Sequence, residues 1–274
     1  MKRILIAAGL AAAMAGLPAG AETPLERGAY LVEGPAGCGN CHSPKGPDAA
    51  PLSGWVLVDA GLEIPAHNIT PGGRVGQWSD AELARAIREG IRPDGSVIGP
   101  PMPIHGYRHL SDGDLAAIVA YLRSVPAVET EFTPAVYPFP LPPNWGPPVD
   151  SVAEVPRGRT VEYGAYLAGP VAHCTECHSL LPGKGPDWEN NFGGGGYEFE
   201  GPWGISVAAN ITNGPDGLAG YSDAEIAAMI TEGRRPDGSE MLPPMPYHHF
   251  ARMTEDDVAA LILYLRTVPP LEGN

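Results

Sequence analysis

Cysteines are few in this sequence, and long apolar runs are missing beyond its first residues. The 274-residue chain has four cysteines, all within two pentapeptides, so none remains for a separate nucleophile or metal ligand. The sequence also shows no nucleophile–base arrangement and no glycine-rich nucleotide loop. After the N-terminal run, no stretch without charges approaches the roughly 20 apolar residues of a membrane-spanning helix. We therefore expect no transmembrane anchor in the mature chain.

Basic residues are also scarce. Lys and Arg number 17 against 32 Asp and Glu, which gives a formal net charge of −15. So acidic a chain is unsuited to nucleic acid or to an anionic membrane surface. It would suit a partner protein with a basic docking face, because complementary charge speeds encounter. Solubility alone explains the same composition, so the charge leaves both interpretations open.

The first 21 residues have the pattern of a secretory signal peptide. A basic start, Met1-Lys2-Arg3, precedes an apolar run over residues 4–17, and a small-x-small cleavage site ends at Ala21. An uncleaved membrane anchor is the alternative, but the run is short for one. The pattern predicts a signal peptide at residues 1–21 and a mature protein in the periplasm.

Two copies of the pentapeptide Cys-x-x-Cys-His occur, at residues 38–42 and 174–178. This is the attachment signature of c-type haem, in which each thiol adds to a vinyl group and the histidine binds the iron. A disulfide or a zinc site is the alternative, but neither needs a histidine directly after the second cysteine in both copies. The motifs predict two covalently attached haem c groups. The predicted attachment residues are Cys38, Cys41, Cys174 and Cys177, and the predicted proximal iron ligands are His42 and His178.

The haem motifs belong to a longer internal repeat. Residues 79–126 and 222–269 align with 26 identities in 48 positions, which indicates two copies of one domain. Each copy opens with the capping box Ser-Asp-Ala-Glu, which predicts a helix that ends at a glycine. Each closes with a helix that starts at Ser111 or Thr254 and has apolar residues at helical spacing.

A shorter repeated segment, Gly-Ala-Tyr-Leu, precedes both motifs at the same distance, at Gly28 and Gly164. Each lies in a predicted helix, where glycine costs about 1 kcal/mol relative to alanine. A glycine at both places predicts close approach of another helix or of the haem. After each motif, a Gly- and Pro-rich stretch leads to Asn-Ile-Thr, at Asn68 and at Asn210. We expect these stretches to be irregular loops.

The sixth iron position decides what chemistry a haem can perform. An open position permits O₂ or peroxide chemistry, whereas a methionine raises the potential and favours electron transfer. Met102 is the only methionine in the first half of the mature chain, and its segment Pro-Pro-Met-Pro recurs at Met245. Met241 competes, but its partner position holds Ile98, which cannot bind iron. We expect Met102 and Met245 to be the second axial ligands.

The remaining methionines and histidines are either expected in the core or are alternative iron ligands. Core packing is the expected role of Met229 and Met253. The alternative iron ligands are His67, His105, His109, His173, His248 and His249. Only His105 and His248 correspond in the repeat. They lie three residues beyond the methionines, so either could bind iron if its loop rearranged.

Four repeated polar residues are candidates to contact the haem propionates. Arg92 and Arg235 carry guanidinium groups that match a carboxylate. Asn68 and Asn210 could hydrogen-bond to one. A surface arginine and a turn asparagine are the respective alternatives, and the sequence leaves them open.

Residues 127–156 contain eight prolines. So many prolines exclude a helix or a central strand and favour an extended segment with polyproline II character. Because the segment is also apolar, it could pack as a strap across the two domains. A free, solvated linker is the alternative.

Taken in order, the repeated segments run from Gly-x-Tyr-Leu and the haem motif through Asn-Ile-Thr, Ser-Asp-Ala-Glu, Arg-Pro-Asp-Gly-Ser and Pro-Pro-Met-Pro to a final Tyr-Leu-Arg helix. This order resembles class I cytochrome c domains. More narrowly, it is similar to the cytochrome c subunits of bacterial periplasmic dehydrogenases that act on alcohols, sugars or aldehydes. The resemblance implies an all-α fold with two tandem cytochrome c domains, at residues 22–126 and 157–274, joined by a Pro-rich linker at 127–156.

The resemblance also implies His/Met-ligated irons and electron transfer from a dehydrogenase or small donor toward a respiratory acceptor. Many members have three haems and a C-terminal membrane anchor, whereas two motifs occur here, which leaves the partner enzyme open. The leading hypothesis is a dihaem electron carrier or the electron-transfer subunit of an oxidoreductase, without its own substrate site.

Two alternatives remain. A dihaem enzyme such as a peroxidase needs an open or displaceable distal site, and a thiosulfate dehydrogenase usually has a cysteine ligand. The matched methionines and the lack of a fifth cysteine argue against both. A structural or metal-binding exported protein would require cysteines that carry no haem.

Overall fold

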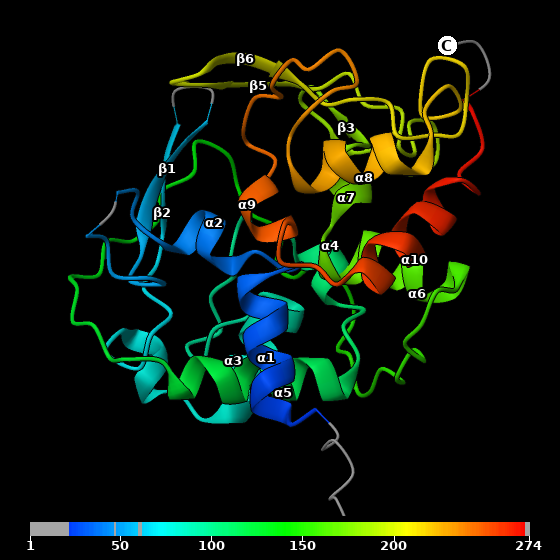
Figure 1. Ribbon diagram of the computed structural model, residues 1–274. Helices are drawn as coiled ribbons and strands as arrows, with labels where there is room; N and C mark the ends of the chain where they lie inside the picture. Colours follow the sequence, from blue (N-terminus) through cyan, green and yellow to red (C-terminus); the bar gives the residue numbers. More distant parts are fainter. Residues whose placement is uncertain (1–21, 47, 60–61, 272–274) are drawn as a thin grey trace, which may run out of the picture.

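The computed structural model describes residues 22–46, 48–59 and 62–271, and its elements occur in a similar order twice (Figure 1). The predicted signal peptide lies outside the described residues. The first half, residues 22–126, contains α1 (Pro24–Glu33), α2 (Cys38–His42), β1 (Trp55–Asp59), β2 (Leu62–Ala66), the 3₁₀ helix η1 (Arg74–Gln77), α3 (Asp80–Glu89), α4 (Ile104–Tyr107) and α5 (Asp112–Ser124). The second half, residues 157–271, contains α6 (Val161–Tyr166), the π-helix η2 (Leu167–Val171), α7 (Cys174–Cys177), β3 (Leu180–Leu181), β4 (Gly185–Pro186), β5 (Glu198–Gly201), β6 (Gly204–Val207), α8 (Asp223–Thr231), α9 (Tyr247–Phe250) and α10 (Glu255–Leu265).

An all-α fold was expected, but the fold is not purely α-helical. The described residues include three two-stranded antiparallel sheets, β1–β2, β3–β4 and β5–β6. They lie in the Gly- and Pro-rich stretches that were expected to be irregular. In β1, the run of Trp55, Val56, Leu57 and Val58 has the β-branched and aromatic residues that favour a strand. The strand pairs with β2 from Trp55 opposite Ala66 onward.

The helix starts follow the predicted caps. The Ser79 hydroxyl accepts from the Glu82 amide, while the Glu82 carboxylate accepts from the Ser79 amide, and Ser222 and Glu225 repeat the arrangement. These contacts satisfy N–H groups that a helix start leaves unpaired. Gly90 ends α3 in a left-handed conformation, with φ of 66°. In the second half, α8 ends two residues before Gly233.

The repeated helical glycines mark close helix contacts, as predicted. A Cβ at Gly28 of α1 would lie 2.0 Å from the carbonyl oxygen of Ala117 in α5. A Cβ at Gly164 of α6 would lie 2.0 Å from the carbonyl oxygen of Ala260 in α10. Both helix pairs therefore approach at a distance that only glycine permits.

Gly28→Ala is expected to lower the free energy of unfolding by about 3 kcal/mol, because the new methyl group meets backbone that cannot turn aside. Gly220→Ala is the matched control, since a Cβ there meets nothing within 4 Å. Urea unfolding of both variants measures the difference. Equal stability of the two variants would show that the helices do not pack so closely.

The two halves share one hydrophobic core. Buried residues of α1 and α5, such as Leu31 and Leu122, belong to the same cluster as Leu167 and Leu261 of the second half. Figure 1 shows α4 and α9 near the middle of the molecule, between the helices of the two halves. Among the described residues, no helix is both long and apolar enough to span a bilayer.

The connecting segment, residues 127–156, contains no helix or strand. It is not a free linker, although many of its residues are exposed, because its groups make a series of hydrogen bonds with the first half. The partners in the first half are Asn68, Glu89, Ile98, Pro100, Ser111, Asp112 and Gly113. The segment therefore packs as a strap along the first half.

Candidate haem sites

Each haem motif forms a short helix, α2 or α7, that begins after a residue in the left-handed conformation. That residue is Gly37 (φ 54°) in the first half and His173 (φ 45°) in the second. All four cysteines are free thiols rather than disulfides. Burial raises the pKa of Cys38, Cys174 and Cys177 to about 12, so the sulfurs stay neutral in the folded chain.

The two motif histidines are held in the same way. The His42 Nδ1 lies 2.6 Å from the backbone carbonyl oxygen of His67, and the His178 Nδ1 lies 2.6 Å from that of Ala209. A carbonyl oxygen can only accept, so each Nδ1 must carry the proton and donate it. That tautomer leaves Nε2 with a free lone pair, which is the form of histidine that binds a metal.

The electrostatics agree with this role. Burial lowers the pKa of both His42 and His178, so the imidazoles are neutral near pH 7. Two thiols, one oriented neutral imidazole and a methionine at the matched position form a donor set that fits haem c in each half. The orienting carbonyls of His67 and Ala209 escaped sequence analysis, because any residue type supplies a carbonyl. The repeated Asn-Ile-Thr that follows each of them is the signal that could have located them.

Asn68 and Asn210 build the turns that place those carbonyls. The Asn68 side-chain oxygen accepts from the Thr70 amide and hydroxyl, and the Asn210 oxygen does the same with Thr212. The Asn68 amide group also donates to the carbonyl of Val128. These are the contacts of turn asparagines, and a propionate contact stays a prediction.

Arg92 and Arg235 likewise contact their own loops. Arg92 donates to the carbonyl of Val97 at 2.7 Å, and Arg235 donates to that of Glu240 at 3.0 Å. Burial lowers the pKa of Arg92, nearby Asp94 opposes this shift, and Arg74 adds to it. Contact of either arginine with a propionate stays a prediction.

The two matched methionines lie in equivalent backbone settings. Met102 and Met245 are half-buried, and both pack against the hydrophobic core. Each follows a cis Pro-Pro bond, and each backbone carbonyl accepts from the amide two residues later. Met253 is buried and Met229 is packed against the core, as expected.

The first methionine segment is secured by the connecting segment. The Tyr137 hydroxyl donates to the carbonyl of Pro100 at 2.7 Å, and the Trp145 indole donates to that of Ile98 at 2.8 Å. In the second half, the hydroxyl of Tyr247 donates to the Leu242 carbonyl instead. The connecting segment therefore contributes hydrogen bonds to the first candidate site, which its composition alone did not indicate.

The alternative histidine ligands have other contacts. The His105 ring meets the rings of Trp145 and Trp188 edge to face, at 5.1 and 5.0 Å. The ring of His248 lies against that of His249. His67 Nε2 and His249 Nδ1 contact the backbone carbonyls of Thr133 and Glu33 respectively.

His173 is expected to make the protein sensitive to acid. Burial lowers its pKa to about 4 from an ordinary value of 6.5, while its ring hydrogen-bonds the Ala36 carbonyl. As pH falls below 6.5, the unfolded chain takes up a proton that the folded chain refuses until about pH 4, so stability falls across this window. We expect the loss due to His173 to be on the order of 2 kcal/mol.

His173→Asn tests this expectation, because asparagine tolerates the left-handed backbone and does not titrate. Urea unfolding of the haem-loaded protein at pH 7 and at pH 4.5 should show a smaller acid loss for the variant. An equal loss in both proteins would contradict the assignment to His173.

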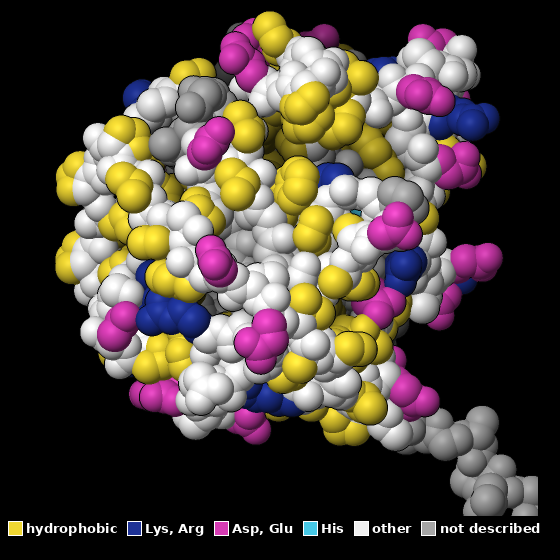
Figure 2. Space-filling view, turned by 90° about the vertical axis from the view of Figure 1, so that its left-hand side faces the viewer, with side chains coloured by type: hydrophobic (Ala, Val, Ile, Leu, Met, Phe, Trp, Pro, Cys, Tyr) yellow, Lys and Arg dark blue, Asp and Glu magenta, His cyan; other side chains and the backbone are white. Residues whose placement is uncertain are grey.

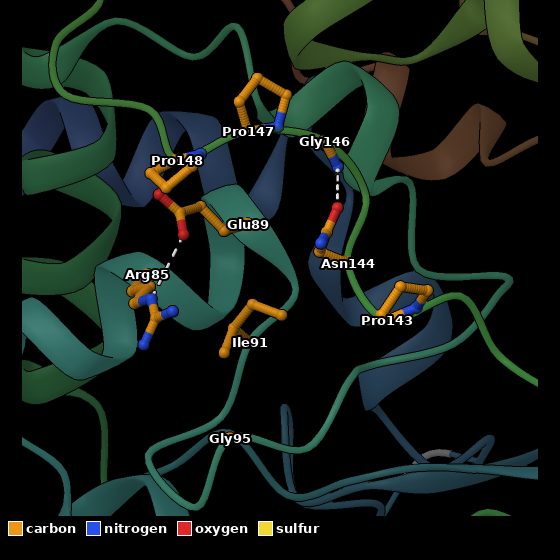
Figure 3. Close-up of a pocket in the computed structure, with 9 residues that line it drawn as sticks. All are labelled: Arg85, Glu89, Ile91, Gly95, Pro143, Asn144, Gly146, Pro147 and Pro148. Atoms are coloured by element: carbon orange, nitrogen blue, oxygen red, sulfur yellow. Dashed lines mark hydrogen bonds and ion pairs between the residues drawn. The ribbon is translucent and has the colours of Figure 1, made fainter.

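Two surface cavities in the described part of the chain are lined by neither a motif cysteine nor Met102 or Met245. The cavity in Figure 3, of about 290 Å³, lies between the end of α3 and the connecting segment, with the Arg85–Glu89 ion pair on one side. A second cavity, of about 260 Å³, is lined by residues of both halves, including His105, Trp145 and Glu176. Burial raises the pKa of Glu176 to about 7.

A helical core with Cys-x-x-Cys-His motifs and oriented histidines defines a protein built to carry c-type haem. Comparison with protein families places residues 25–126 in the family described as Cytochrome c. The first half is therefore a cytochrome c domain, and such a domain binds haem c covalently. The helical part of the predicted fold is confirmed there.

Similar proteins are named as cytochrome c subunits. The chain is 29% identical to the fructose dehydrogenase cytochrome subunit of Gluconobacter japonicus, over 92% of this chain and 54% of that protein. It is 28% identical to a diheme cytochrome c-type protein of Cereibacter sphaeroides, over 86% of this chain and 83% of that protein. It is 25% identical to the gluconate 2-dehydrogenase cytochrome c subunit of Pantoea cypripedii, over 89% of this chain and 59% of that protein.

These matches confirm the resemblance to c-type cytochromes and to the cytochrome c subunits of bacterial dehydrogenases. The chain spans little more than half the length of the two dehydrogenase subunits named above. The diheme protein is matched over most of its length.

Proposed function

We propose that this protein is a dihaem c-type cytochrome that transfers electrons in the periplasm, as the electron-transfer subunit or the electron acceptor of an oxidoreductase. The observation that carries the proposal is the repeated orientation of His42 and His178 by backbone carbonyls. Two such sites, each followed by a matched methionine segment, suit two irons that keep their ligands during turnover.

Each half contributes the same set of roles. In each half, the two cysteines would hold the haem covalently, and the oriented histidine and Met102 or Met245 would bind its iron. When bound, haem iron supplies a one-electron Fe(III)/Fe(II) couple, which needs no proton and no substrate site. The protein keeps the histidine neutral, holds the methionine segment rigid and shields the site with core side chains.

We interpret the fold of the whole chain as that of a dihaem cytochrome. Two tandem cytochrome c domains, at residues 22–126 and 157–274, with the Pro-rich segment 127–156 between them, explain the internal repeat. Removal of the signal peptide at residues 1–21 would place both domains in the periplasm. Relatives named as subunits of fructose and gluconate dehydrogenases support a dehydrogenase as the partner.

The exposed surface is consistent with a protein partner. Figure 2 views the molecule from the left of Figure 1, and many hydrophobic side chains are exposed on this face with acidic ones among them. Val58 of β1 and Ile205 and Val207 of β6 are each more than half exposed. A partner face that is apolar with basic groups around it would complement this surface.

The alternative of a dihaem enzyme, such as a peroxidase or thiosulfate dehydrogenase, has less support. A methionine segment occupies the matched position in both halves, whereas a peroxidase needs a position that opens. No relative named above is a peroxidase.

Covalent haem content tests the proposal directly. A haem-stained denaturing gel and the haem-to-protein ratio of the exported protein should show two thioether-linked haems per chain. Replacing both Cys174 and Cys177 by serine is expected to leave only the first haem. Replacing both Cys38 and Cys41 by serine is expected to leave only the second haem. A wild-type ratio of one or none would contradict the dihaem assignment.

A further inference from the structure

Each haem motif, with the residue before it, lies against the methionine segment of the other half or the short helix that follows it. The Asn40 side chain, third in the first motif, lies 3.4 Å from the carbonyl oxygen of Pro244, next to Met245. A Cβ at Gly37, directly before the first motif, would lie 3.6 Å from the Cβ of His249, and a Cβ at Gly106 would lie 3.7 Å from that of His173, directly before the second motif. Gly37 and His173 are equivalent in the repeat, and so are Gly106 and His249, so the halves meet in a reciprocal way.

The motifs are also close to one another. The Tyr107 hydroxyl donates to the backbone carbonyl of Ala36, two residues before the first motif, at 3.3 Å. The rings of Tyr107 and His173, from opposite halves, lie 6.0 Å apart edge to face. The separation of the two haem sites therefore depends on how the halves are held together.

Two tyrosines hold the halves together, of which Tyr166 is buried and Tyr30 is half-buried. Tyr30 of the first half donates to the Asp257 carboxylate of the second half at 2.6 Å. Tyr166 of the second half donates to the Asp114 carboxylate of the first half at 2.8 Å. Both tyrosines come from the repeated Gly-Ala-Tyr-Leu, and both aspartates from the start of the last helix of each repeat.

The same hydroxyls cap the helices of the opposite half. The Thr254 amide, at the start of α10, donates to the Tyr30 hydroxyl at 3.2 Å. The Ser111 amide, at the start of α5, donates to the Tyr166 hydroxyl at 3.1 Å. Each tyrosine thus binds both a backbone group and a carboxylate of the other half, which fixes position as well as distance.

Burial makes these contacts hard to rearrange. Tyr166 and Asp114 are each 6% exposed, and Tyr163 beside them is fully buried. A sliding movement of one half would leave these polar groups without partners and away from water, which is unfavourable. The interface therefore has one preferred register.

We propose that Tyr30 and Tyr166 are positioning residues that hold the two haem motifs at a fixed separation for electron exchange. The inference rests on the proposed dihaem function. One electron enters at one site and one leaves at the other, and no bond is made or broken and no proton is required. The residues themselves act only by setting geometry.

The test uses the haem-loaded protein with Tyr30→Phe, Tyr166→Phe and the double variant. Ser124→Ala is the control, because it removes a hydroxyl that donates to the Tyr121 carbonyl within α5 of the first half. After flash reduction of one haem, the rate of electron equilibration between the haems is measured. The magnetic interaction between the two oxidised irons is measured separately by electron paramagnetic resonance.

The double variant should keep both haems and the absorption bands of their axial ligands. Its equilibration rate should fall about tenfold or more, because reaction rates fall steeply with misplacement on the scale of an ångström. The magnetic interaction should weaken with it, and each single variant should lie between. Ser124→Ala should match the wild type in both measurements.

A folded double variant with unchanged rate and magnetic interaction would overturn the inference. If the double variant does not fold, the two single variants provide the test. An unchanged equilibration rate and an unchanged magnetic interaction in both single variants would overturn the inference. A wild type that carries two haems but exchanges no electron between them would instead contradict the proposed function.

Discussion

Met102→His should lower the midpoint potential of the first haem by on the order of 0.2 V and leave the second haem unchanged. A methionine sulfur favours Fe(II) over Fe(III) relative to a second imidazole, so its replacement stabilises the oxidised iron. The expected effect is local, because Met245 serves the other site in its own equivalent backbone setting. Potentiometric titration followed by absorption resolves the two haems.

Met229→His is the matched control, since this side chain packs against the core and has no methionine at its repeat position. It should leave both potentials within ordinary error of the wild type, provided that the protein folds. A first-haem potential that does not respond to Met102→His would mean that another group binds this iron. His105, three residues later, would then be the first candidate.

Arg27→Ala should cost about 3–5 kcal/mol of stability, because it leaves the Asp114 carboxylate buried without its cation. Arg27 and Asp114 are 7% and 6% exposed, and two hydrogen bonds of 2.7 and 2.9 Å join them. Burial costs the Arg27 guanidinium its hydration, but Asp114 more than offsets this and holds the pKa of Arg27 above its ordinary value. Urea unfolding at neutral pH measures the loss.

An exposed ion pair gives the control for this prediction. Arg159 and Asp256 pair at 2.7 Å, with side chains more than half exposed, so Arg159→Ala should cost less than about 1 kcal/mol. Replacing both buried partners, Arg27→Met with Asp114→Leu, should recover part of the stability, since no unpaired charge remains. Equal losses for Arg27→Ala and Arg159→Ala would contradict the buried pair.

Features with a local sequence signature were predictable. The capping boxes at Ser79 and Ser222 and the close helix contact at Gly28 depend on side chains a few residues apart or on one missing Cβ, and the structure confirms them. The hairpins β1–β2 and β5–β6 were missed, because the glycines and prolines around them indicated loops more strongly than the short β-branched runs indicated strands.

The less predictable part of the candidate sites depends on tertiary contacts. The carbonyls that orient His42 and His178 are backbone groups, which leave no residue signature. The exchange of Tyr30 and Tyr166 between halves was also missed, although the repeat of Gly-Ala-Tyr-Leu was visible. A repeat shows that two segments are equivalent, but it does not tell whether each contacts its own half or the other.

The most direct test of the central claim is the optical signature of methionine bound to oxidised haem iron, measured on the wild-type protein. We predict a weak thioether–iron band near the red end of the spectrum that corresponds to two sites per chain. It should fall by half in Met102→His and disappear when Met245→His is added. A wild-type spectrum without this band at either haem would contradict an account based on two His/Met electron-transfer centres.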